Sequence, residues 1–200
     1  MRGKRSLILI SGLALAVSLA LPAGVFAQEA AYVGNTQCKF CHNKKEEGEQ
    51  WNKWKAEDHA KAFANLSSDA AKALAQKKNV AKPPAEAPEC LKCHVTAFDP
   101  ATGKTPDRII KDDGVQCESC HGPSSLHLVD GKKFKSGDKS VNIAAHQPLP
   151  DQKVCLKCHN EESATWNPER YTLPDGKKAG FDFKQAWEKI AHPNPLKKKS

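Results

Sequence analysis

The sequence predicts a mainly α-helical fold with extensive loops, formed by a single compact domain. Three observations support this prediction. The chain of 200 residues contains 13 prolines and 12 glycines, which favour turns and loops over long regular elements. Only 39% of its residues are hydrophobic, and many of these lie within the first 27. Its eight cysteines form pairs spread along the chain, and a small core of this kind needs such additional links.

The first 27 residues have the three parts of a secretory signal peptide. A basic start is followed by an apolar run over residues 7–21, and Ala27 completes the small-residue pattern of a cleavage site. We therefore expect residues 1–27 to be a cleaved Sec signal peptide and residues 28–200 to form the domain. The apolar run is short for a lasting membrane span. Export predicts a periplasmic protein, with the cell surface as the alternative location.

All eight cysteines belong to C-x-x-C pairs, and a histidine follows each pair directly. The four motifs are Cys38, Cys41 and His42; Cys90, Cys93 and His94; Cys117, Cys120 and His121; and Cys155, Cys158 and His159. Disulfides or zinc sites would use the cysteines but would leave the four regularly placed histidines unexplained. C-x-x-C-H is the attachment motif of c-type haem, whose proximal iron ligand is the histidine. The sequence therefore predicts four covalently bound haem c groups, around which the domain is organised.

The spacing within each motif has a geometric reason. On a helical turn, positions i and i+3 share a face, so both thiols can reach the two vinyl groups of one porphyrin. The histidine at i+4 lies on the same face, where its imidazole can reach the iron. We therefore expect a short helical turn at each motif. Because removal of 27 residues from a chain of 200 leaves only 173 for four haems, we expect the porphyrins to supply most of the core.

The histidines outside the motifs are the candidate distal iron ligands. They are His59, His127, His146 and His192. Met1 is the only methionine and belongs to the leader, which excludes Met/His ligation in the exported protein. Four haems and four spare histidines predict low-potential bis-histidine ligation throughout. The alternative for each spare histidine is an ordinary surface or core residue; His127 is expected in a loop and His146 in a proline-flanked segment.

Three helices are predicted outside the motifs, over residues 46–66, 68–78 and 182–191. In the first, tryptophan and phenylalanine side chains repeat at helical spacing on the face that also holds His59. Asp182 is the predicted N-cap of the last helix. Pro193 ends that helix, which allows His192 to turn back toward a haem. Residues 82–88, 99–114 and 172–180 are expected to form connectors and turns.

The charge of the chain does not indicate a nucleic-acid partner. The formal net charge of +8 falls to +5 when the three basic residues of the leader are removed. Each oxidised haem adds about one net negative charge, which brings the loaded protein to about +1. The sequence also contains no glycine-rich phosphate loop. We expect redox proteins as partners, namely an electron-donor and an electron-acceptor cytochrome.

Several stretches resemble the tetrahaem cytochrome c-554 family. They are residues 34–42 (GNTQCKFCH), residues 58–62 (DHAKA) and residues 114–123 (GVQCESCHGP). The resemblance implies a mostly helical fold in which haems pack in close pairs suited to electron tunnelling. It also implies that the haem held by His94 lacks a distal ligand, which differs from the four bis-histidine sites expected from the histidine count.

Three functional classes follow from these expectations. The first is a periplasmic electron carrier, and it is the function that we expect. The second is a conductive cytochrome that assembles into haem filaments, in which a neighbouring subunit supplies a ligand. The third is a small enzyme that converts nitrogen oxides or hydroxylamine at one five-coordinate haem. Because the sequence contains no recognisable catalytic acid–base set, we expect an electron-transfer protein and not an enzyme.

Overall fold

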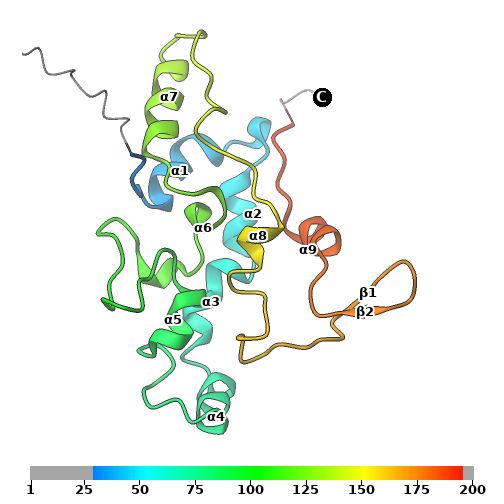
Figure 1. Cartoon of the computed structure of the whole chain (residues 1–200). Helices are drawn as coiled ribbons and strands as arrows, with labels where there is room; N and C mark the ends of the chain where they lie inside the picture. The colour runs from blue at the N-terminus through cyan, green and yellow to red at the C-terminus, as the bar shows by residue number, and fades with distance from the viewer. Residues whose placement is uncertain (1–28, 196–200) are drawn as a thin grey trace, which may run out of the picture.

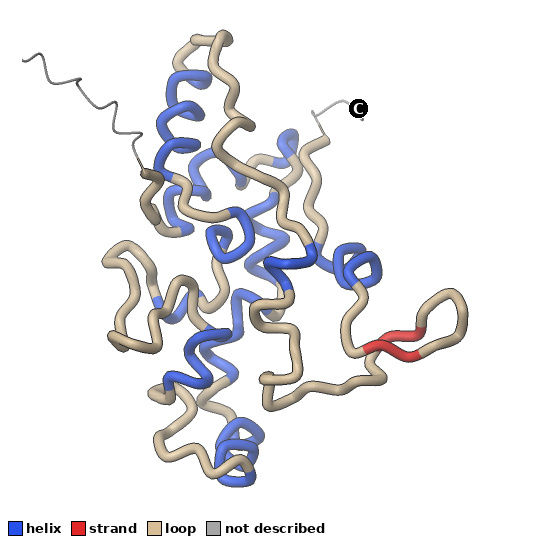
Figure 2. The backbone as a smooth tube through the Cα atoms, in the orientation of Figure 1, coloured by secondary structure: helices blue, strands red, loops and turns tan. Residues whose placement is uncertain are grey.

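The computed structural model describes residues 29–195, and helices and loops dominate this part of the chain (Figures 1 and 2). Its one sheet within these residues is a two-stranded antiparallel hairpin of β1 (Tyr171–Thr172) and β2 (Lys178–Ala179), in the segment expected to be a turn. The mainly helical, loop-rich fold class is thereby confirmed. The predicted signal peptide, residues 1–27, lies outside the described residues.

Each motif lies on or directly after a short helix. These helices are α1 (Asn35–His42), α5 (Pro88–His94), α6 (Cys117–His121) and α8 (Gln152–Cys155). Although α8 ends at Cys155, the helical pattern continues in the hydrogen bond from His159 N to Cys155 O, 2.9 Å long. The predicted helical turns are confirmed, so each motif has the local geometry that presents its cysteines and histidine on one face.

The single helix predicted over residues 46–66 is wrong, because the structure divides this segment. It contains η1 (Lys45–Glu47), α2 (Gln50–Ala56), η2 (His59–Lys61) and α3 (Ala62–Asn65). At the break, Glu57 is extended, and His59 O accepts a 2.9 Å hydrogen bond from Val115 N. Trp54 Nε1 donates a 2.8 Å bond to Val115 O. The helix is interrupted here, and Trp54 and His59 instead bind the backbone of Val115, which lies just before the third motif.

A glycine makes this close approach possible. Gly114 has a φ of +61°, in the left-handed region that favours glycine. A Cβ atom at this position would lie 2.7 Å from His59 O, closer than a side chain can approach. Gly114 therefore lets the segment that leads into α6 lie directly against η2.

Two of the predicted helices are confirmed and one helix was missed. The confirmed helices, α4 (Asp69–Lys77) and α9 (Phe183–Ile190), begin after N-caps in which Ser68 and Asp182 accept backbone hydrogen bonds. The missed helix is α7 (Ser125–Lys135), expected as a loop. In Figure 1, α7 lies at one end of the molecule and α4 at the other, with α1, α2 and α6 between them.

The aliphatic core is small and lies on one side of the fold. It consists of Leu66, Leu91, Val95, Phe98 and Ile109, gathered around α5. The largest fully buried side chains are polar: Gln116, Glu118, Asn35 and Thr96. This distribution agrees with the expectation that side chains alone do not provide most of the interior.

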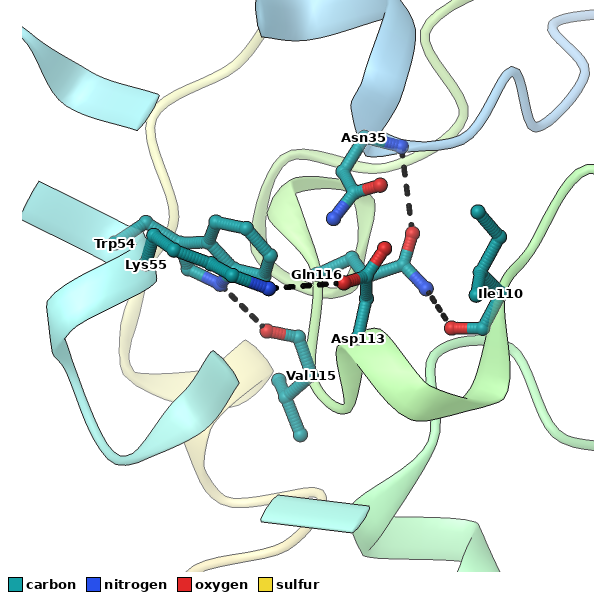
Figure 3. A network of polar contacts seen from close by, with 7 residues as sticks. All are labelled: Asn35, Trp54, Lys55, Ile110, Asp113, Val115 and Gln116. Carbon is teal, nitrogen blue, oxygen red and sulfur yellow. Dashed lines mark hydrogen bonds and ion pairs between the residues drawn. The ribbon is translucent and has the colours of Figure 1, made fainter. Parts of the chain in front are cut away.

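A polar network holds three separate segments of the chain together (Figure 3). Gln116 Oε1 accepts a 3.3 Å bond from Asn35 N, and Gln116 Nε2 donates a 2.7 Å bond to Ile110 O, which precedes η3 (Lys111–Asp113). Lys55 pairs with Asp113 at 3.1 Å. The start of α1, helix α2 and the approach to α6 are thus fixed relative to one another.

A helix that spans a membrane has to be long and predominantly apolar. No helix among residues 29–195 is long and apolar enough to cross a membrane.

Candidate haem sites

All eight cysteines are free thiols that are partly accessible, and they meet across the motifs. The thiols of Cys38 and Cys117 influence each other: Cys117 lowers the pKa of Cys38, and Cys38 raises that of Cys117. In the same way, Cys158 lowers the pKa of Cys93 to about 7, and Cys93 raises that of Cys158. The thiols required for thioether formation are therefore present and unpaired, and the structure brings the first motif to the third and the second motif to the fourth.

The third and fourth motifs are also neighbours, because α6 packs against α8. Burial raises the pKa of Cys120 to about 11, and the nearby Cys155 contributes to this shift. Cys120 belongs to the third motif and Cys155 to the fourth. The attachment sites thus follow one another in space in the order first, third, fourth, second, which differs from their order in the sequence.

The structure brings six of the eight histidines together as three facing pairs. The ring centroids are 6.2 Å apart for His42 and His127, 6.0 Å for His59 and His159, and 6.3 Å for His121 and His192. Each pair joins one motif histidine to one of the spare histidines, and the two partners come from segments far apart in the sequence. Three of the four candidate distal ligands therefore lie opposite a proximal candidate.

These separations match the space that an iron atom between two imidazoles requires. Two metal–nitrogen bonds of about 2 Å, with about 1 Å from each ring nitrogen to its centroid, separate the centroids by about 6 Å. All three observed distances lie close to this value. Together with the free thiols, the histidine pairs show that the donor set of this chain fits c-type haem.

Backbone carbonyl groups orient four of the histidine rings. The Nδ1 atoms lie 2.7 Å from Ala62 O for His94, 3.0 Å from Pro148 O for His121, 2.7 Å from Ile143 O for His127 and 2.9 Å from Ile190 O for His192. A carbonyl oxygen only accepts hydrogen bonds, so Nδ1 carries the proton in each ring. Nε2 is then left with its lone pair, which is the arrangement that a metal-binding histidine needs.

Burial also keeps several imidazoles in the neutral, metal-binding form. It lowers the pKa of His42, His59, His121 and His159 from their usual value of 6.5. The side chain of Gln50 opposes this effect at His42. Because a protonated imidazole has no lone pair for a metal, the lowered pKa favours ligation at neutral pH.

His94 and His146 are in none of the histidine ring contacts found among residues 29–195. His146 Nδ1 lies 3.0 Å from Asp130 Oδ2, and its side chain is 47% exposed. His94 belongs to α5, beside the aliphatic core. The structure therefore does not assemble the fourth histidine pair that the histidine count predicts; the remaining spare histidine faces Asp130 of α7 instead.

Two features of the site were missed by the sequence analysis. Residues 143–148 form a strap whose carbonyl groups at Ile143 and Pro148 hold the Nδ1 atoms of His127 and His121. No sequence signal identifies such a strap, because every residue has a carbonyl group. The second feature is the fully buried carboxylate of Glu118, between the two cysteines of the third motif. An acidic residue at that place in the motif was the available signal.

Known proteins that are similar to this chain in sequence or structure are cytochromes. The family model for cytochrome c554 and c-prime matches residues 37–122. Cytochrome c-554 of Nitrosomonas europaea is 31% identical over 175 residues, which cover 80% of this chain and 72% of that protein. The multiheme cytochrome MtrA of Shewanella baltica is 29% identical over 101 residues, covering 46% of this chain and 29% of that protein. The reduced-state structure of the Nitrosomonas europaea cytochrome c554 has 25% identity and a TM-score of 0.47, over 81% of this chain and 79% of that one.

Proposed function

This chain belongs to the cytochrome c-554 family of multihaem electron-transfer proteins with covalently bound haem c, and we propose that it carries electrons through three bis-histidine haems and one haem with an open distal side. The three facing histidine pairs are the observation that supports this proposal.

The proposed ligand set follows from the pairs. It assigns His42 and His127 to the first haem, His121 and His192 to the third, His159 and His59 to the fourth, and His94 alone to the second. Each cysteine pair binds the porphyrin whose iron is held by the histidine that follows it. His146 is not a ligand in this assignment, because it faces Asp130.

When bound, each haem supplies a one-electron couple at its iron. The contribution of the protein is to hold the attachment sites in contact, in the order first, third, fourth, second. This order defines a series with two ends, at α1 and at α5. Separate ends suit a carrier that accepts an electron from one partner and delivers it to another, and we propose that both partners are redox proteins of the periplasm.

One observation favours a second function. His94 has a fixed Nδ1 and no facing histidine, so its iron would offer an open position to a small molecule. An enzyme that converts a nitrogen oxide or hydroxylamine would use such a position. The relatives are named as cytochromes, and we propose that this chain is an electron carrier and not an enzyme.

Ferric EPR spectroscopy of the purified haem-loaded protein tests the ligand set. We expect three low-spin irons and one high-spin iron, and we expect the high-spin signal to disappear when cyanide or nitric oxide is added. Four low-spin irons that are insensitive to added ligand would contradict the assignment. Turnover assays with nitrite, nitric oxide and hydroxylamine separate the two functions, because a carrier shows no catalytic consumption of these molecules.

A further inference from the structure

Glu118 is a carboxylate buried without a cation. Its side chain is 1% exposed. No ion pair within residues 29–195 includes it. Burial of an unpaired charge is costly unless hydrogen bonds or another charge offset the lost hydration. Glu118 is therefore not an ordinary surface carboxylate, and its burial requires a separate explanation.

The contacts of Glu118 are all with hydrogen-bond donors. Oε1 accepts from Val33 N at 3.0 Å and from Ser124 N at 2.8 Å. Oε2 accepts from Val33 N at 3.1 Å and from Gly34 N at 2.8 Å. A protonated carboxyl group would need an acceptor for its O–H, whereas both oxygens here face backbone N–H groups. The surroundings are built for the ionised form.

Glu118 also lies between two haem attachment sites. It directly follows Cys117 in α6, and two of the backbone N–H groups that it binds, those of Val33 and Gly34, lead into α1, which carries Cys38. The charge of Glu118 contributes to the pKa of both thiols and raises each of them. The buried anion is therefore placed at the junction of the first and third sites.

We propose that Glu118 is the counter-charge of the first and third haems and that it lowers their reduction potentials. A ferric haem carries one more positive charge than a ferrous haem, so a nearby anion in a low-dielectric interior stabilises the oxidised state. The couple involves one electron at the iron and no proton. The inference rests on the haem attachment proposed above, and it adds a residue that sets the direction of electron flow along the series.

The test compares two substitutions that separate charge from shape. Glu118→Gln removes the charge and keeps the length of the side chain. Glu118→Asp keeps the charge but shortens the side chain that reaches the backbone N–H groups. In haem-resolved potentiometric titrations followed by EPR, we expect Glu118→Gln to raise two of the four potentials and Glu118→Asp to leave them close to the wild-type values. The matched surface control is Glu46→Gln, which neutralises an exposed carboxylate after the first motif and should shift none of them.

Two results would overturn the proposal. One is a Glu118→Gln protein with four haems whose potentials equal those of the wild type; the other is an equal upward shift in the Gln and Asp variants, which would make Glu118 a structural clamp only. Haem content, measured on every variant, tests the attachment sites separately from the potentials.

A measurement on the unsubstituted protein covers the case in which Glu118→Gln does not fold. In redox-difference infrared spectra with ¹³C-labelled glutamate, we expect reduction to perturb an ionised glutamate band. A carboxylic acid band that appears on reduction, or no glutamate signal at all, would contradict the proposed counter-charge.

Discussion

Removal of His127 is the most direct test of the histidine pairs. Its ring centroid lies 6.2 Å from that of His42, with an angle of 18° between the rings. His127→Ala removes one imidazole from the pair and leaves the proximal histidine and both cysteines of the first motif in place. The iron of the first haem then loses its distal ligand, while the other three haems keep theirs.

The magnitude of the effect follows from the number of pairs. Three facing pairs predict three low-spin irons and one high-spin iron in the wild type. His127→Ala should change this to two of each, as counted in the ferric EPR spectrum of the loaded protein. Free imidazole should restore the third low-spin iron, because the substitution leaves a space of the size of the lost ring.

The matched control is His146→Ala, which removes a spare histidine that faces Asp130 and no other histidine ring. We expect it to leave three low-spin irons and one high-spin iron. If His146→Ala produces an additional high-spin iron, or if His127→Ala leaves the spectrum unchanged, the reasoning from centroid distances is refuted.

Four further outcomes are expected. Trp54→Phe should lower the free energy of unfolding of the loaded protein by about 1–3 kcal/mol in chemical denaturation, because Val115 O loses its 2.8 Å hydrogen bond within a buried environment. Burial lowers the pKa of His59 from 6.5, so its neutral form persists as the pH falls through that value; a pH series of EPR spectra should show loss of this ligand only at a lower pH, and loss at or above 6.5 would contradict the burial argument. Asp130→Asn should cost at most about 1 kcal/mol of stability and leave the spin states unchanged, since its contact with His146 is partly exposed. Protein produced without haem attachment should remain largely unfolded by far-ultraviolet circular dichroism, because the aliphatic core is confined to the region of α5; a cooperative thermal transition of the haem-free chain would show that the side chains suffice.

The local features of the fold could be predicted from the sequence, because they depend on neighbouring residues. The helical turn at each motif follows from cysteine spacing, and the starts of α4 and α9 follow from the capping side chains of Ser68 and Asp182. The break after Ala56 could not be predicted, because it depends on the distant Val115, whose backbone bonds to both Trp54 and His59. Helix α7 was missed although Ser124, at its N-cap position, is a residue type that often begins helices; in the structure Ser124 forms no side-chain capping bond there.

In the haem sites, too, the residues set by a local motif could be predicted, whereas those set by tertiary contacts could not. The attachment cysteines and the proximal histidines are defined by a five-residue motif. Which spare histidine faces which motif depends on tertiary contacts, such as the carbonyl groups of Ile143 and Pro148 that orient His127 and His121. The sequence likewise does not reveal that His146 faces Asp130.

The proposed series of sites explains how an electron carrier can retain an open iron. In the order first, third, fourth, second, the site of His94 is at one end, next to the aliphatic cluster. A small molecule bound there would alter the potential of the terminal haem, whereas a molecule bound at the third or fourth site would alter a haem that lies between the two ends. The three histidine pairs occupy the other positions of the series, including both interior ones. The buried charge of Glu118 lies at the opposite end, at the junction of the first and third sites, where it would favour the oxidised state and direct electrons toward the site of His94.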